Sequence, residues 1–394
     1  MQWVTLLSQQ TSLEMALQEI GIQARAQLPQ ADLGILFISS AFVSEYPRVL
    51  PLVHQLLPIK VLVGCSASGV IGGGLEIEED AAISLTLARL PDVGLHPFYL
   101  EPGTLPDLDA SPATWEDYIG IPNHAQPHFV LFADGFSGGV TDLLQGLDFA
   151  YPQGTKVGGL LSTASATSPH GLFLNDRLYR QGIVGVALTG NIRVDSVVAQ
   201  GCRPVGSPLR VSAAEGNVIT SLEDRPPLPL VKAMVEQLPP QEQNLIRYAN
   251  AIAVGIVTDP FKQDPQPGDF LVRMIVGLDP KSGAIAVGDR LRPGQRIQLH
   301  VRDAETAAED LRRALEQYRL AMQTPPAGAL LFACVARGVT LYQTPHVDSS
   351  LMRSVLGDIP LGGFFSNGEI GPVGGTTYLH GFTAVFALFR PAYP

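Results

Sequence analysis

Residues 362–375 form a glycine-rich segment that contains a single acidic side chain. Six glycines and one proline surround Asn367 and Glu369 between two apolar runs. Glycine is favoured where the backbone needs a positive φ or where another group approaches closely, so this segment is expected to make a poor strand. On such an irregular loop the Glu369 carboxylate can bind an ammonium or guanidinium group, and the Asn367 amide offers a donor and an acceptor. Bracing of the loop or capping of a helix is the alternative role for both residues.

Residues 64–69 form a second small-residue turn after an apolar run, and they include Cys65, Ser66 and Ser68. Successive backbone N–H groups in such a turn can form a concavity for a carboxylate, with the two hydroxyl groups adding orientation. A tight turn packed under a neighbouring element is the alternative. No Lys, Arg or His adjoins Cys65 to lower its pKa, which argues against a reactive thiol. Arg337, after another apolar run, is expected to pair with a ligand carboxylate or with Glu369.

Residues 135–139 match the G-x-S-x-G pattern of serine hydrolases, with Ser137 in the place of the nucleophile. The pattern follows a predicted strand, which Asp134 ends, and it precedes a predicted helix. No His-Gly segment that could build an oxyanion hole comes before it. We therefore predict that Asp134 and Ser137 belong to a loop that binds a ligand, and that the protein is not an enzyme.

Other chemical motifs are missing from the sequence. It contains no P-loop, no G-x-G-x-x-G dinucleotide turn and no H-E-x-x-H zinc motif. His124 and His128 have a spacing of four residues, but Pro127 prevents the helix that would place both on one face. The sequence therefore predicts neither a cofactor nor a metal site.

Bulk properties restrict the partners and the compartment. The chain has 394 residues, a formal net charge of −11 and 46% hydrophobic residues. An acidic chain is a poor ligand for a phosphate backbone, so we expect no nucleic acid and a neutral, cationic or zwitterionic partner. No apolar run reaches the ~18–20 residues of a membrane span, and the first residues do not resemble a signal peptide. Three separated cysteines fit a reducing compartment, so we expect a cytoplasmic protein without membrane insertion.

The elements that must position these residues follow from periodicity. Apolar residues at helical spacing predict a helix near residues 12–28, and Asp303 is expected to cap a second helix. Strands are predicted near residues 33–38, 60–63, 81–89, 129–132 and 183–188. Three proline clusters between residues 202 and 240 favour a junction between two halves there.

A weak internal repeat relates these elements. Residues 129–134 match 329–334, residues 157–162 match 361–366, and residues 181–188 match 380–388. Residues 35–40, 63–69 and 81–89 repeat the order less closely. Repeated strand–helix–strand units predict an α/β fold with mixed β-sheets covered by helices in a layered αββα-like sandwich of two related halves. The glycine-rich turns are expected at equivalent places, so Ser162 at the end of one turn joins the candidate ligand contacts.

Several of these segments resemble the FIST family. Residues 201–206, 268–273, 277–280, 287–289, 300–304, 362–375 and 379–381 look like the FIST C-terminal domain. Residues 64–69, 134–139 and 158–159 resemble the FIST N-terminal domain. Ala336 departs from the glycine that the family usually has before the Arg-Gly pair.

The resemblance implies an N-terminal domain over residues 1–200, a C-terminal domain over residues 201–394, and a sensory role in signal transduction. It also implies an amino-acid-like small-molecule ligand and a protein partner that receives the signal. A scaffold that binds only another protein is the main alternative, and a hydrolase that uses Ser137 or Cys65 is a further one.

Overall fold

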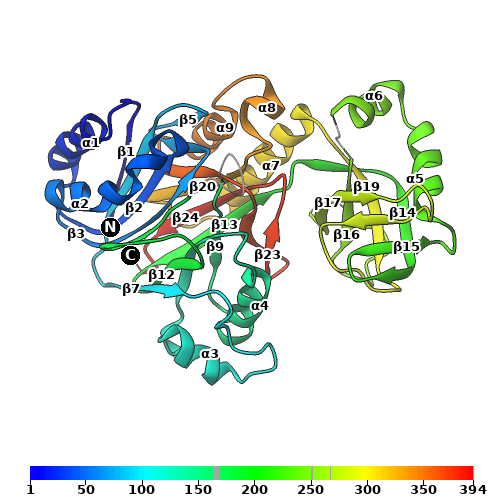
Figure 1. Cartoon of the computed structure of the whole chain (residues 1–394), viewed down its shortest axis with the longest axis horizontal. Helices are drawn as coiled ribbons and strands as arrows, with labels where there is room; N and C mark the ends of the chain where they lie inside the picture. The colour runs from blue at the N-terminus through cyan, green and yellow to red at the C-terminus, as the bar shows by residue number, and fades with distance from the viewer. Residues whose placement is uncertain (163–168, 250–251, 267, 394) are drawn as a thin grey trace. The chain divides into compact units, whose positions relative to one another are not determined.

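The computed structural model describes every residue except 163–168, 250–251, 267 and 394. The chain forms two compact units: Met1–Ala199 with Arg312–Pro394, and Gln200–Leu311. The second unit is therefore inserted into the first (Figure 1). The mixed α/β fold with helix-covered sheets is confirmed.

Three copies of one structural repeat make up the first unit, and only the start of one helix of the third copy, residues 304–311, is counted with the second unit. Each copy has a first strand, a helix, two parallel strands joined by helical segments, a β-hairpin and a last strand that returns beside the first. The first copy consists of β1 (Gln2–Ser8), α1 (Leu13–Gln27), β2 (Ala31–Ser39), η1 (Ser40–Glu45), α2 (Tyr46–Leu56), β3 (Ile59–Ala67), the hairpin β4 (Gly69–Gly72) and β5 (Leu75–Glu78), and β6 (Ile83–Arg89).

The second and third copies have the same order of elements. The second consists of β7 (Val93–Leu100), α3 (Pro112–Ile119), η2 (Asn123–Ala125), β8 (His128–Ala133), α4 (Val140–Ala150), β9 (Lys156–Leu160), the hairpin β10 (Leu172–Leu174) and β11 (Arg177–Tyr179), and β12 (Ile183–Gly190). The third consists of β13 (Arg193–Ala199), α7 (Ala304–Ala321), β20 (Gly328–Cys334), α8 (Gly338–Tyr342), α9 (Val347–Leu356), β21 (Leu361–Ser366), the hairpin β22 (Glu369–Val373) and β23 (Thr376–His380), and β24 (Ala384–Arg390).

Each repeat gives its hairpin to the sheet of another repeat. The three six-stranded sheets run β1-β6-β2-β3-β10-β11, β7-β12-β8-β9-β22-β23 and β13-β24-β20-β21-β4-β5. The hairpin of the second repeat thus completes the first sheet, that of the third completes the second, and that of the first completes the third. This cyclic exchange ties the two ends of the chain into one core, which the sequence repeat alone did not reveal.

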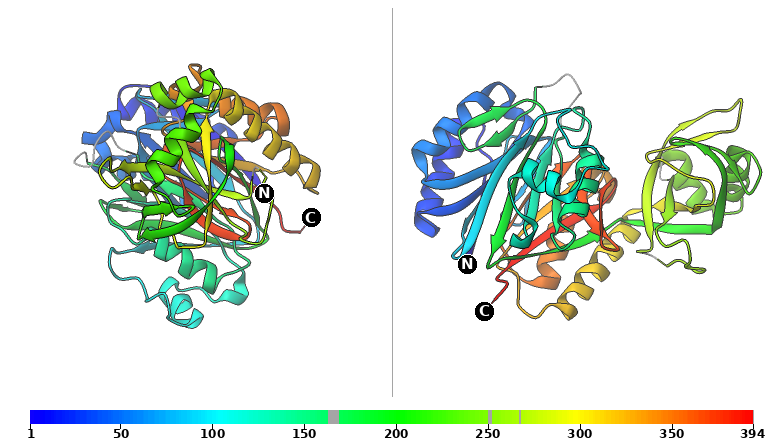
Figure 2. Two further views of the ribbon diagram at one scale, coloured as in Figure 1. Left: turned by 90° about the vertical axis from the view of Figure 1, so that its right-hand side faces the viewer. Right: turned by 90° about the horizontal axis from the view of Figure 1, so that it is seen from below.

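Helices cover the outer faces of the sheets, and aromatic rings fill the space between the inner faces. Figures 1 and 2 show α1 and α2 side by side on the first sheet, where their apolar residues form a core with β1, β2 and β6. Phe37, Phe132 and Phe332 occupy matching places in β2, β8 and β20, and the Phe364 ring lies 5.0–5.9 Å from these three rings. Rings at such distances pack favourably and dominate the energy of a core.

Three glycines at matching places allow the parallel strands to pack. A Cβ atom on Gly64, Gly158 or Gly363 would lie 1.9 Å from the carbonyl oxygen of Leu36, Leu131 or Leu331 respectively. The predicted alignment of 157–162 with 361–366 is therefore one residue out, because Gly158 corresponds to Gly363. The expectation of a poor strand in residues 362–375 is wrong: β21 and β22 form there, since bare backbone lets the neighbouring strand approach closely.

The second unit is a closed six-stranded barrel in the order β14-β15-β18-β17-β16-β19. Its elements are β14 (Cys202–Glu215), β15 (Val218–Leu222), α5 (Pro227–Glu236), α6 (Pro240–Ala249), β16 (Ile252–Val257), β17 (Phe270–Leu278), β18 (Ile285–Val287) and β19 (Arg296–Arg302). Two of the proline clusters mark helix starts at Pro227 and Pro240, where a missing N–H costs nothing.

Two predicted helix starts are confirmed. Ser12 caps α1 by accepting a hydrogen bond from the backbone N–H of Met15 at 3.4 Å. Asp303 caps α7 by accepting one from the backbone N–H of Thr306 at 2.8 Å.

Candidate functional site

The loop between β8 and α4 borders a pocket at the carboxyl end of a parallel strand pair, where α/β proteins commonly bind ligands. Gly138 and Gly139 have φ values of 73° and 75°, which let the backbone turn into α4. Ser137, Gly138 and Gly139 line the pocket, whose volume is about 470 Å³. A pocket of this size fits a small metabolite.

The lining of this pocket is acidic and partly apolar. Glu101 and Asp107 come from the segment after β7, and Asp142 comes from the first turn of α4. Leu105, Leu108 and Ile183 supply apolar surface. Among the described residues that line the pocket there is no Lys, Arg or His. The three carboxylates create a negative potential that favours a ligand with a positively charged group.

The hydrogen bonds of Ser137 argue against a nucleophilic role. Its hydroxyl donates to Asp134 at 2.5 Å and accepts from the backbone N–H of Gly182 at 3.0 Å. His170 contacts Asp134 rather than Ser137: its Nε2 lies 3.6 Å from Oδ1, the carboxylate oxygen that does not bind the Ser137 hydroxyl. A serine nucleophile needs a base that takes the hydroxyl proton directly, and here that place is held by a carboxylate. Asp134 and Ser137 instead brace the loop that lines the pocket.

Two of the predicted contacts meet at a corner between repeats. The Ser162 hydroxyl accepts hydrogen bonds from the backbone N–H and the hydroxyl of Ser68, at 2.9 Å and 3.0 Å, and donates to the carbonyl of Phe365. Asn367 lies beside them, where its backbone N–H donates to the carbonyl of Leu160 at 3.2 Å, and its side chain is exposed. The ends of the glycine-rich turns of all three repeats therefore meet at this corner, and they occupy the equivalent places that the internal repeat predicts.

Cys65 and Ser66 lie in β3 rather than in an open turn. Both are fully buried, and the Ser66 hydroxyl accepts a hydrogen bond from the backbone N–H of Gly171 at 2.9 Å. Burial raises the pKa of the Cys65 thiol well above its usual value, so it stays protonated and unreactive. The expected concavity at residues 64–69 is thus a packed strand end.

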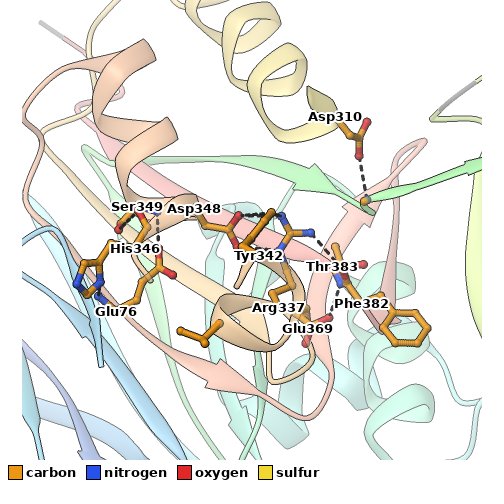
Figure 3. Close-up of polar contacts among 12 residues, drawn as sticks. Glu76, Asp310, Arg337, Tyr342, His346, Asp348, Ser349, Glu369, Phe382 and Thr383 are labelled. Carbon is orange, nitrogen blue, oxygen red and sulfur yellow. Dashed lines mark hydrogen bonds and ion pairs between the residues drawn. The ribbon is translucent and has the colours of Figure 1, made fainter. Parts of the chain in front are cut away.

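Glu369 and Arg337 also lie in the interior, which corrects their expected place on an open loop. Glu369 is in β22 and has no exposed surface; one carboxyl oxygen accepts from the backbone N–H of Thr383 at 3.2 Å. Burial raises the pKa of Glu369 well above its usual value, although the nearby Arg337 opposes this shift. The guanidinium of Arg337 donates two hydrogen bonds to Asp348, at 2.7 Å and 2.8 Å (Figure 3).

Sequence reasoning missed the acids of the pocket and the partner of Arg337. Glu101, Asp107 and Asp142 follow no motif, and only the packing of the segment after β7 against the β8–α4 loop brings them together. Asp348 lies eleven residues beyond Arg337, and no periodic pattern relates the two. No group of three or more His, Cys, Asp or Glu side chains that could hold a metal ion occurs in the described part of the chain. In the same residues no helix is both long and apolar enough to cross a membrane.

Comparisons with known proteins identify the family. The FIST N domain matches residues 32–225 and the FIST C domain matches residues 230–372. An uncharacterized protein of Mycobacterium tuberculosis is 37% identical over 358 residues, which make up 91% of this chain and 91% of that relative. An uncharacterized protein of Mycobacterium bovis is 35% identical over 369 residues, or 93% of each chain. FIST domains act in sensing and signal transduction. The chain therefore belongs to the FIST family of sensory domains.

Proposed function

We propose that this FIST protein senses an amino-acid-like metabolite and binds it in the pocket at the carboxyl end of β8. The single observation that carries the proposal is a pocket of about 470 Å³ that combines three carboxylates with a glycine-rich helix start. The carboxylates attract the ammonium group of the ligand. Asp134 and Ser137 hold the loop in place beneath it.

The start of α4 provides for the opposite charge. Gly139 is the N-cap of this helix, and no side chain of the described residues caps it. The first backbone N–H groups of a helix have no partner within the helix, and they favour an anion such as a ligand carboxylate. The carboxylates of the pocket and the N-terminus of α4 together favour a ligand that carries both a positive and a negative charge. The corner formed by Ser68, Ser162 and Asn367 is proposed as a further contact region, and the interior residues Cys65, Ser66, Arg337 and Glu369 as its structural support.

Calorimetric titration and thermal unfolding with free amino acids and simple amines test this proposal. A ligand at about 100 times its Kd stabilises the folded protein by about 2.7 kcal/mol. Asp142→Asn should weaken binding of the best compound about tenfold, because it removes one charge-assisted contact of roughly 1.4 kcal/mol. Asp109→Asn is the matched control, since Asp109 is an exposed acid outside the pocket lining.

Two results would contradict the proposal in different ways. If no compound shifts the unfolding temperature, the protein does not sense these metabolites, and a scaffold that binds only other proteins becomes the better explanation. If a compound binds but Asp142→Asn and Asp109→Asn bind it alike, the ligand lies elsewhere. In either case the division at residue 200, the cytoplasmic location and the signalling partner remain separate proposals.

A further inference from the structure

The hairpin β4–β5 is the contribution of the first repeat to the sheet of the third. It joins this sheet through only three residue pairs between β4 and β21, which link Val70, Ile71 and Gly72 to residues 362–364. A hairpin with so short a ladder depends on further contacts to stay in place.

Two carboxylates of β5 supply these contacts by capping helices of the third repeat. Glu78 accepts a hydrogen bond from the backbone N–H of Val339 in α8 at 2.9 Å. Glu76 accepts one from the backbone N–H of Ser349 in the first turn of α9 at 2.6 Å, and its own N–H donates to Nδ1 of His346 at 2.9 Å (Figure 3). The Ser349 hydroxyl also donates to the carbonyl of Gly74 at the hairpin turn, at 3.2 Å. Of the contacts between the hairpin and α9, only the one made by the Glu76 carboxyl can change with protonation of a hairpin side chain.

Glu76 lies in an environment that disfavours its negative charge. The residue is 2% exposed, and its second carboxyl oxygen has no hydrogen-bond partner among the described residues. The ionisable groups around it are Asp348 of α9, Glu78 of β5, Tyr342 of α8, and His346 and Arg337 in the segments before the two helices. The carboxylate of Asp348, which pairs with Arg337, repels a negative charge on Glu76. Burial first, and Asp348 second, raise the pKa of Glu76 to about 7.

A second pocket lies between the hairpin and α9. It has a volume of about 380 Å³, and its walls include Gly73 and Gly74 at the hairpin turn and Ser349, Met352 and Arg353 of α9. Residues 3–5 of β1, Gln27 of α1 and residues 358–361 complete the lining. Movement of the hairpin away from α9 would widen this pocket.

We propose that Glu76 acts as a proton-operated latch, which holds the hairpin β4–β5 on α9 when protonated and loosens it when ionised. The released hairpin opens the pocket beside it. The direction follows from linkage: the docked state binds the proton more tightly than the open or unfolded chain, whose glutamate has an ordinary pKa of 4.5. Docking is therefore strongest at low pH and weakens as the pH rises between 4.5 and about 7. The device does not depend on the ligand pocket at β8.

Hydrogen exchange of the full-length protein at about pH 6 and about pH 8 tests the latch. After correction for the intrinsic rates, amides of residues 69–78 and of the first turn of α9 should exchange about tenfold faster at the higher pH. Glu76→Gln keeps an acceptor for the N–H of Ser349 but cannot ionise, so its exchange should not depend on pH. Glu79→Gln removes the same charge from an exposed neighbour and should behave like the wild type.

The latch is refuted if the wild type shows no pH dependence in these segments. It is also refuted if Glu76→Gln retains the tenfold change, or if Glu79→Gln loses it. If Glu76→Gln does not fold, infrared difference spectra of the wild type between about pH 6 and about pH 8 test whether a buried carboxyl group loses its proton in this range. They must show the loss of a protonated carboxyl band; without it the proposal fails.

Discussion

Gly363→Ala should destabilise the first unit severely, because the added Cβ has no space. The new atom would lie 1.9 Å from the carbonyl oxygen of Leu331, whereas real Cβ contacts essentially never fall below 3.0 Å. Leu331 and Gly363 are directly paired within the parallel ladder of β20 and β21. A separation of about 1 Å between the strands would break this ladder in the middle of the core.

The loss of unfolding free energy in Gly363→Ala has two contributions. Overpacking a core ordinarily costs about 1–3 kcal/mol, and here the obstacle is fixed backbone rather than a side chain that can move. Gly363 also has a φ of 150°, a conformation that alanine adopts only with a further strain of about 1–3 kcal/mol. We expect a loss of about 4 kcal/mol or more, out of a typical total of about 5–15 kcal/mol.

Urea unfolding followed by tryptophan fluorescence measures this loss. The two tryptophans of the chain, Trp3 and Trp115, both lie in the first unit, so the signal does not report on the barrel. Gly381→Ala is the matched control, since nothing lies within 4 Å of its added Cβ. We expect it to change the free energy of unfolding by no more than about 0.5 kcal/mol. If the two substitutions change the free energy of unfolding equally, or if Gly363→Ala leaves it unchanged, the close approach of the neighbouring strand is not the reason for a glycine at this position.

Two further predictions concern buried charges. Burial lowers the pKa of His128 to about 4, so stability should fall by up to about 3 kcal/mol as the pH drops from 6.5 to about 4. Urea midpoints across this range should show a shallower fall in His128→Asn, and equal slopes would contradict the assignment. Asp348→Asn should cost about 3–5 kcal/mol, because it leaves the guanidinium of Arg337 buried without its anion. Combining it with Arg337→Met should recover most of this loss in the same assay; a double variant no more stable than the single one would refute the pairing argument.

Local features of the chain were predictable because they depend on neighbouring residues. The helix start near residue 12, the cap at Asp303 and the apolar strands follow from propensity and periodicity, so their positions agree with the structure. The repeat was also visible, although one residue out at Gly158, because glycines that solve the same steric problem leave a similar pattern in each copy. The role of those glycines was not predictable, since a glycine required by a neighbouring strand looks the same as one required by a ligand.

The sequence by itself therefore determined the class of fold, the family and the equivalent places of the glycine-rich turns. Tertiary structure decided which strands pair across repeats, and with that the burial of Glu369 and the attachment of Glu76 to α9. It also decided that Glu101, Asp107 and Asp142 share a pocket. The physical reason is the range of the interactions: caps and periodicity act over a few residues. Strand exchange, burial and clustering of charge depend on segments that only the folded chain brings together.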